Sequence, residues 1–174
     1  LIAAIGCGGS SGSAAPSDRS VSLFITDDFR TDYDQAWGTL YRLELIADDS
    51  TTTTVYDNAD GRRFDFNSLR DGSGAKYLFL NVANVRNANY RSARVTLGDK
   101  MTLFPTGVTT GTEATVQGTA AGTGKVSVTF NLPTMARFED DDDFVLDFDM
   151  PNFTVVAGNV VPSLKQGGRS GLDD

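Results

Sequence analysis

The chain contains no histidine among its 174 residues. This absence excludes Ser-His-Asp and Cys-His nucleophilic catalysis, histidine-ligated zinc or iron sites and c-type haem attachment. Cys7 is the only cysteine, so the chain forms no internal disulfide and offers no other thiolate nucleophile. Chemistry that needs only oxygen atoms stays compatible with this composition, namely calcium binding and glycoside hydrolysis by paired carboxylates.

Positive charge is also scarce, with 15 lysines and arginines against 23 aspartates and glutamates and a net charge of −8. This deficit argues against a nucleic-acid partner and against an anionic membrane surface as the direct partner. No stretch after Gly6 is long and apolar enough for a transmembrane helix. The hydrophobic content of 40 % is nevertheless sufficient for the core of one domain.

The first thirteen residues read L-I-A-A-I-G-C-G-G-S-S-G-S, a short apolar stretch followed by Cys7 and a Gly/Ser linker. This order resembles the end of a bacterial lipoprotein signal peptide, in which Cys7 receives the lipid and Leu1–Gly6 is removed. Under that reading the protein is extracytoplasmic, at the cell surface, and contacts the membrane only through a lipid on Cys7. The alternatives are an ordinary flexible terminus with one stray cysteine, or an apolar N-terminal strand held by packing.

Composition divides the chain into three parts. Residues 1–18 form the signal remnant with a Gly/Ser tether or donor strand, residues 19–162 form the folded domain, and residues 163–174 form a polar tail. Within the middle part, apolar and polar residues alternate with the period of a β-strand, as in the series Val21, Leu23 and Ile25. About ten short strands separated by regular turn signals predict an all-β sandwich or barrel.

The predicted strands share this alternation and β-branched or aromatic content. They are Val21–Thr26, Trp37–Ile46, Val55–Tyr56, Arg63–Phe66, Tyr90–Leu97, Met101–Phe104, Glu113–Thr119, Lys125–Leu132, Phe144–Met150 and Phe153–Val156. The turn Asn58-Ala59-Asp60-Gly61 separates the third from the fourth. The segment Tyr77–Val85 fits a strand and a helical face equally well.

The longest alternating segment, Trp37–Ile46, carries the only tryptophan. Strict alternation places on one face Trp37, Tyr41, Leu43 and Leu45, and on the other Gly38, Arg42 and Glu44. Burying an aromatic ring of this size removes roughly 150–250 Å² from water. We therefore expect Trp37 to lie between two sheets, and Trp37→Ala to cost about 3–5 kcal/mol.

Five segments together resemble a known family: V-S-L-F-I-T-D-D-F at Val21–Phe29, W-G-T-L-Y-R-L-E-L at Trp37–Leu45, F-D-F-N-S-L at Phe64–Leu69, N-Y-R-S-A-R-V-T-L at Asn89–Leu97 and L-D-F-D at Leu146–Asp149. Their order and spacing are similar to those of a bacterial lipoprotein family catalogued as domain of unknown function 4382. Phe29 stands where the family usually has proline, and Asn89 where it usually has glycine. The resemblance implies an exported surface domain with an immunoglobulin-like or transthyretin-like antiparallel β-sandwich, and it implies no activity.

The acidic run Glu139–Asp143 is the densest charge in the chain. A calcium ion relieves repulsion between neighbouring carboxylates and takes six to eight oxygen ligands. The candidate metal ligands are therefore Asp140, Asp141, Asp142, Asp143, Asp27 and Asp28. The spacing is not that of an EF-hand, and a solvated loop that discourages pairing with other sheets explains the same run.

A second acidic set, Asp27, Asp28, Asp32 and Asp34, precedes the long strand. If this corner lies beside Asp147 and Asp149, a shared cation or a polar cluster becomes possible. The alternative is that these aspartates cap turns by accepting hydrogen bonds from nearby backbone N–H groups.

We expect no catalysis and no cofactor apart from possible calcium, because nothing in the sequence indicates the cleft that a carboxylate pair requires. The leading functional hypothesis is a structural or adhesive surface module acting through protein contacts. Its sharpest form is a filament, in which Leu1–Ile5 adds to an edge strand of a neighbouring copy. The alternative is an extracellular carbohydrate- or ligand-binding domain, helped by calcium, with Tyr33, Tyr56 and Tyr90 as a possible sugar-stacking platform.

Overall fold

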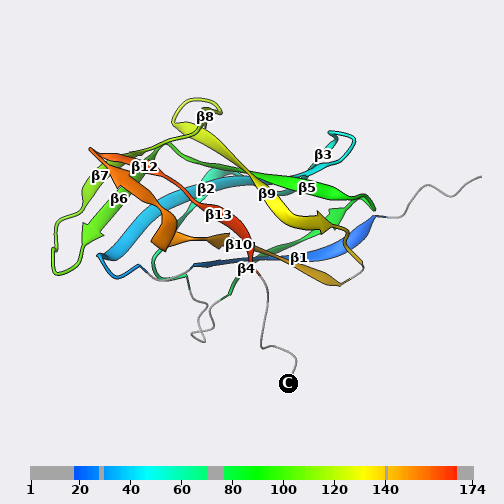
Figure 1. Ribbon diagram of the computed structural model, residues 1–174, viewed down its shortest axis with the longest axis horizontal. Coiled ribbons are helices and arrows are strands. Elements are labelled where there is room, and N and C mark those ends of the chain that lie inside the picture. Colours follow the sequence, from blue (N-terminus) through cyan, green and yellow to red (C-terminus); the bar gives the residue numbers. More distant parts are fainter. Residues whose placement is uncertain (1–17, 28–29, 70–76, 140, 168–174) are drawn as a thin grey trace, which may run out of the picture.

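The computed structural model describes residues 18–27, 30–69, 77–139 and 141–167. These residues form two β-sheets that pack face to face, with the core between them (Figure 1). The only helical element in the described ranges is a 3₁₀ turn, η1, at Met150–Asn152. No helix in this part of the chain has the length and apolarity needed to cross a membrane. The predicted all-β sandwich is therefore confirmed.

The smaller sheet has four strands, ordered β13 (Leu164–Gly167), β10 (Asp142–Phe148), β1 (Arg19–Asp27) and β4 (Leu78–Val85). The ambiguous segment is thus a strand, β4, antiparallel to β1. Strand β10 instead runs parallel to β1. Strand β13 lies in the part predicted to be a polar tail, and its pairing with β10 extends the fold beyond the predicted boundary at residue 162.

The larger sheet is ordered β11 (Thr154–Val156), β12 (Asn159–Val161), β7 (Thr112–Val116), β6 (Lys100–Pro105), β2 (Tyr33–Ala47), β5 (Tyr90–Gly98), β9 (Lys125–Ala136) and β8 (Thr119–Ala120). Strand β3 (Thr52–Asp65) pairs with the other edge of β2. Strand β2 pairs with β6 through its first half and with β5 through its second. Because β7 and β12 are parallel, as are β1 and β10, both sheets are mixed and not wholly antiparallel as predicted.

Aromatic rings fill the centre of the core. Phe66, just after β3, stacks on Phe148 at the end of β10, with ring centroids 4.1 Å apart and planes inclined by 19°. Phe138 contacts both Tyr90 and Phe144, at centroid distances of 5.8 Å and 6.0 Å. The stack between Phe66 and Phe148 joins the two sheets, because one ring follows a strand of the larger sheet and the other belongs to the smaller.

A β-bulge in the middle of β2 overturns the prediction for Trp37. On β5, Leu97 and Thr96 pair with Leu40 and Arg42, so Tyr41 is an extra residue opposite this pair. A bulge of this kind places two successive side chains on one face and inverts the alternation beyond it. The core-facing residues of β2 are accordingly Ala36, Gly38 and Leu40 before the bulge, and Leu43, Leu45 and Ala47 after it.

Trp37 therefore lies on the outer face and is only half-buried. Its indole N–H donates to the side chain of Gln35 at 3.0 Å, and the guanidinium of Arg63 lies 5.2 Å from its ring centroid. Gly38, predicted to face outward, is the residue that faces the core, where an added Cβ would stand 2.4 Å from the Phe66 ring. The sequence prediction applied strict alternation through the bulge and therefore assigned Trp37 and Gly38 to the wrong faces of the sheet.

The turn between β2 and β3 carries a carboxylate with a lowered pKa. Asp49 accepts hydrogen bonds from the hydroxyl and backbone N–H of Thr51 and from Arg86, and together they lower its pKa from the ordinary 3.8 to about 2. Because the folded pKa is lowered, the stabilisation is present above about pH 4 and is lost as pH falls towards 2.

We expect carboxyl-carbon NMR to give Asp49 a titration midpoint near 2 in the folded protein. Thr51→Val should raise this midpoint more than Arg86→Gln does, because the Thr51 hydroxyl is the largest cause of the shift. A midpoint near 3.8 in the unmodified protein would contradict this assignment.

Candidate functional site

The predicted calcium ligands do not form one cluster in the described part of the chain. Asp27 pairs with Phe148 at one end of the β1–β10 ladder, whereas Val21 pairs with Asp142 at the other. Six residues of strand separate these ends, about 20 Å at 3.3 Å per residue. Asp27 accepts a hydrogen bond from the Leu69 N–H at 3.2 Å.

The start of β10 is held by local bonds instead. The Asp142 carboxylate accepts from the Glu139 N–H at 2.6 Å, and the Asp141 N–H donates to the Ser20 carbonyl at 2.9 Å. Asp143 is exposed on β10. In the ranges that the structure describes, no group of three or more His, Cys, Asp or Glu residues could hold a metal ion. Asp28, Asp140 and the predicted lipidation site Cys7 lie outside these ranges, so calcium and lipidation stay predictions.

Of the second acidic set, Asp27 lies beside the closing L-D-F-D motif, because Thr26 pairs with Asp147 and Asp27 with Phe148. Asp32 instead pairs with Arg30, and Asp34 accepts from the Gly107 N–H. The cation beside Asp147 and Asp149 is an ammonium group. Lys165 of β13 places its Nζ 3.4 Å from a carboxylate oxygen of Asp147 and 3.4 Å from one of Asp149. Sequence reasoning missed Lys165, since it belongs to the segment that was predicted to be a tail.

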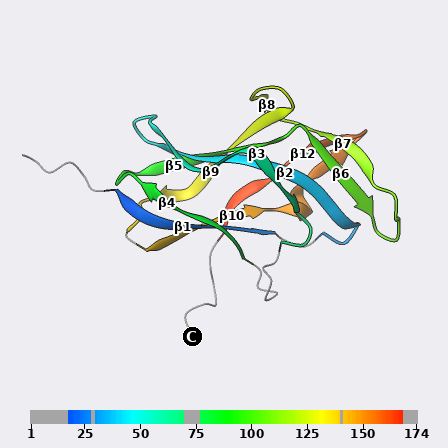
Figure 2. The ribbon, with the colours of Figure 1, turned by 180° about the vertical axis from the view of Figure 1, so that it is seen from behind.

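A groove of ≈ 500 Å³ lies on the outer face of the larger sheet. Residues of β2, β5 and β9 line its floor, and residues of the middle of β3 and of the β8–β9 hairpin line its two sides. The β8–β9 hairpin projects from the larger sheet in both ribbon views (Figures 1 and 2). Tyr41, Glu44, Thr96 and Ser127 line the floor. Thr96 and Glu44 are nearly buried there, at 9 % and 8 % exposure.

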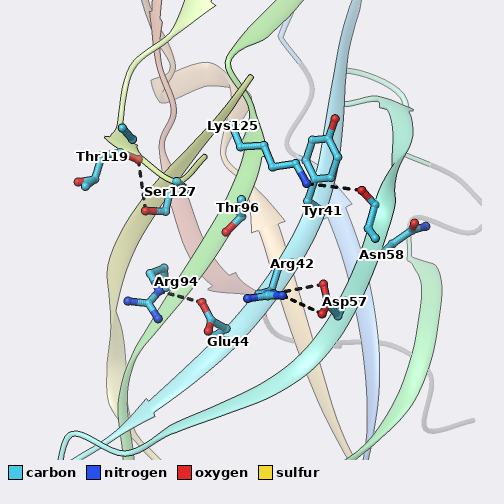
Figure 3. Close-up of a pocket in the computed structure, with 13 residues that line it drawn as sticks. Tyr41, Arg42, Glu44, Asp57, Asn58, Arg94, Thr96, Thr119, Lys125 and Ser127 are labelled. Atoms are coloured by element: carbon cyan, nitrogen blue, oxygen red, sulfur yellow. Dashed lines mark hydrogen bonds and ion pairs between the residues drawn. The ribbon is translucent and has the colours of Figure 1, made fainter. Parts of the chain in front are cut away.

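The bulge in β2 also accounts for the first wall of the groove, which is the middle of β3. Arg42 pairs with Asp57 and Leu40 pairs with Arg62, so residues 58–61 of β3 stand opposite Tyr41 alone. These four extra residues form an excursion of β3, from which Asn58 and Ala59 line the groove on the side of Tyr41 (Figure 3). Gly61 ends the excursion with φ +75°, where an added Cβ would lie 2.7 Å from that ring. The turn signal at 58–61, predicted to separate two strands, thus marks an excursion within one strand.

The second wall is the hairpin that joins β8 to β9. Thr119 pairs with Ser127, and the Ala121 N–H donates to the Lys125 carbonyl at 3.0 Å. Two glycines with positive φ, Gly122 and Gly124, allow the chain to reverse between the strands. Lys125 reaches across the groove to the opposite wall, with its Nζ 3.9 Å from the Tyr41 ring centroid and 3.5 Å from the Ala59 carbonyl oxygen (Figure 3).

Two ion pairs lie along the groove. Arg42 donates through Nε and Nη2 to the two oxygens of Asp57, at 3.2 Å and 2.9 Å. Arg94 donates through Nε to Glu44 at 2.8 Å. The Asp57 hydrogen bond raises the pKa of Arg42, and the Glu44 hydrogen bond raises the pKa of Arg94. Both guanidinium groups therefore stay charged at every physiological pH.

The groove carries positive charge in an acidic protein. Its lining has three cationic side chains, Arg42, Arg94 and Lys125, and two anionic ones, Glu44 and Asp57, a surplus of one positive charge. The whole chain has a net charge of −8. Sequence alternation placed Arg42 and Glu44 on the outward face correctly. It gave no signal for the groove itself, because the lining comes from five strands far apart in the chain.

The predicted sugar-stacking platform is wrong. Tyr90 and Tyr56 are buried, at 0 % and 8 % exposure, and Tyr33 lies beneath the Arg30 guanidinium at 5.1 Å. The aromatic residue of the groove is Tyr41, with Lys125 over its ring and Gly61 beside it. Its ring is thus occupied by contacts within the chain.

Neither the curated proteins nor the solved structures include one that matches this chain. A sequence model of the family described as "Domain of unknown function (DUF4382)" matches residues 19–164. The match begins at the first residue of β1, ends at the first of β13, and includes every strand that lines the groove. The chain belongs to the family described as domain of unknown function 4382.

Proposed function

We propose that this chain is a non-catalytic carbohydrate-binding module of an exported surface protein, and that the glycan binds in the groove between the β3 excursion and the β8–β9 hairpin. The observation that carries the proposal is the convergence of hydroxyl, amide and cationic side chains in one groove. Thr96, Ser127 and Asn58 supply hydrogen-bonding groups that match the hydroxyls of a sugar.

The chemistry of the groove favours a glycan over a protein segment. The floor strands β2 and β5 are each paired on both sides, so they have no free edge for strand addition. Of the side-chain types that anchor protein interfaces, the groove has Tyr41, whose ring is covered by Lys125, and Arg42 and Arg94, which are each paired with a carboxylate. The polar and charged side chains of the groove are therefore suited to hydrogen-bond a polar ligand.

A binding role without catalysis agrees with the state of the groove carboxylates. Glycoside hydrolysis needs one carboxyl group that donates a proton to the leaving oxygen. Glu44 and Asp57 are each held by an arginine, an arrangement that suits structural ion pairs. The chain also has no histidine that could take the role of the acid.

The protein-contact function predicted from the sequence stays a prediction. Its filament form depends on Leu1–Ile5, which lies outside the described residues. The extracytoplasmic location was predicted from the same N-terminal segment, so it too is a proposal. The groove, by contrast, consists entirely of described residues.

The proposal is tested by filling the groove. Ser127→Trp places an indole on the floor opposite Thr96, and Val108→Trp is the matched control, because Val108 is 47 % exposed and lies outside the groove. On an array of neutral and acidic glycans, we expect the unmodified protein and the control to bind a common subset, and Ser127→Trp to lose that binding at least tenfold. An array with no bound glycan, or equal binding by all three proteins, would refute the function.

A further inference from the structure

We infer that the glycan bound in the groove carries a carboxylate group, as a uronic acid does, and that the positive charges of Lys125 and Arg94 attract it. This inference rests on the proposed carbohydrate-binding function and adds the ligand class. The three cations of the groove differ in how many donors their contacts within the chain leave free, and the lining has one more positive than negative charge.

Lys125 is the cation of the groove whose charge no carboxylate of the described residues neutralises. An ammonium group has three donors, and Lys125 directs its own at the Ala59 carbonyl and the face of Tyr41. No carboxylate of the described residues pairs with it. The positive charge of Lys125 is therefore the surplus charge of the groove.

Arg94 has a second set of donors. It uses Nε for Glu44, and its terminal nitrogens make no hydrogen bond within the described ranges. Its side chain is 38 % exposed, whereas the Glu44 side chain beneath it is 11 % exposed. Glu44 thus fixes the orientation of Arg94 from below, while the end of the guanidinium stays accessible from the groove.

Arg42 is the least available of the three, because two of its nitrogens already bind both oxygens of Asp57. Charge-assisted hydrogen bonds to a carboxylate are roughly twice as strong as neutral ones. The accessible donors of Lys125 and Arg94 therefore make a carboxylate the best-matched charged group for this groove. Thr96 lies between these two side chains in the close-up view and can donate to a neighbouring hydroxyl (Figure 3).

The size of the charge surplus argues against phosphate polymers. A nucleic-acid strand presents one negative charge about every 3.4 Å, and the groove has one net positive charge to offer. The net charge of −8 on the chain also opposes polyanions everywhere else on the surface. A sugar chain with one carboxylate in its bound segment matches the single surplus positive charge of the groove.

The test uses a matched pair of ligands: hexagalacturonic acid that is methyl-esterified on five of its six residues (the acid), and the fully methyl-esterified form (the ester). The two differ by one carboxylate charge and one methyl group. In isothermal titration calorimetry, we expect the acid to bind at least tenfold more tightly than the ester. Raising the sodium chloride concentration from 50 to 500 mM should weaken the acid and leave the ester unchanged, because salt screens the charged contact.

The variants are Lys125→Gln and Arg94→Gln, with Lys100→Gln as the control, because Lys100 is exposed on β6 and lies outside the groove. We expect each groove variant to lower the affinity for the acid about tenfold, as expected for a lost charge-assisted bond. The control should bind normally. Lys125→Gln leaves no carboxylate unpaired, so it remains informative if Arg94→Gln, which strands Glu44, lowers the melting temperature.

The remaining outcomes distinguish a failure of carboxylate recognition from a failure of carbohydrate binding. Equal binding of acid and ester, abolished by Ser127→Trp, would overturn the carboxylate inference and leave carbohydrate binding intact. Hexaglutamate binding as tightly as the acid would overturn the glycan class, because the groove would then select charge alone. If neither sugar binds, both the inference and the function fail.

Discussion

Replacing Phe148 with alanine is expected to lower the free energy of unfolding by about 3–5 kcal/mol. The Phe148 ring is fully buried and stacks on Phe66 at a centroid distance of 4.1 Å, and this stack joins the two sheets. Removing the ring leaves a cavity lined by residues of both sheets, which cannot close without moving one sheet against the other. A loss of this size is a large fraction of the stability of a single domain.

Trp37→Ala is the matched comparison, and we expect it to cost about 1 kcal/mol. Trp37 is the larger side chain, yet it lies half-exposed on the outer face, against Arg63 and Gln35. Urea denaturation of the two variants at 25 °C, with equal m-values as a check on two-state unfolding, measures the difference. Equal losses for the two variants would mean that β2 has no bulge and that the sequence alternation was right.

Gly38→Ala is expected to destabilise the domain by about 1–3 kcal/mol, although it adds a single methyl group. The added Cβ would stand 2.4 Å from one carbon of the Phe66 ring and 3.3 Å from the Met101 methyl group. Phe66 cannot retreat, because its other side is stacked on Phe148. The substitution therefore disturbs the same ring stack from the opposite direction.

The control is Gly98→Ala, a second strand glycine on the larger sheet. Its added Cβ would find its nearest neighbour, the Thr39 Cβ, at 3.5 Å, which is ordinary van der Waals contact. We expect this variant to be as stable as the unmodified protein or about 0.5 kcal/mol more stable, since alanine loses less backbone entropy on folding. Thermal unfolding of both variants is sufficient, and similar melting temperatures would show that Gly38 does not face Phe66.

Local alternation was enough to predict most strands and several side-chain directions. Val21, Leu23 and Ile25 face the core as expected, and each is 0 % exposed. Arg42 and Glu44 face outward as expected. They follow the bulge in the chain, as the core-facing Leu43 and Leu45 do, and alternation among these four residues is regular. Predictions that count phase over a few residues succeed where the strand is regular, since the pleat repeats every two residues.

The same counting failed at the irregular positions. Trp37 was assigned to the wrong face because a bulge is an extra residue in one strand relative to its partner, and only the partner reveals it. The β3 excursion was interpreted as a turn for the same reason, since four extra residues opposite Tyr41 look like an ordinary Asn-Ala-Asp-Gly turn in the sequence. Lys165 was missed because a four-residue strand such as β13 has too few residues to show a period.

The sequence by itself determined the fold class, the family and the chemistry that is excluded. An all-β period, five ordered motifs and the absence of histidine are properties of the chain that no packing can change. Only the tertiary structure decided where the cations gather. Arg94 and Glu44 are 50 residues apart in the chain, and Lys125 reaches Ala59 over 66 residues. Strand pairing brings them together, and this pairing depends on register and on one bulge, which local sequence pattern does not encode.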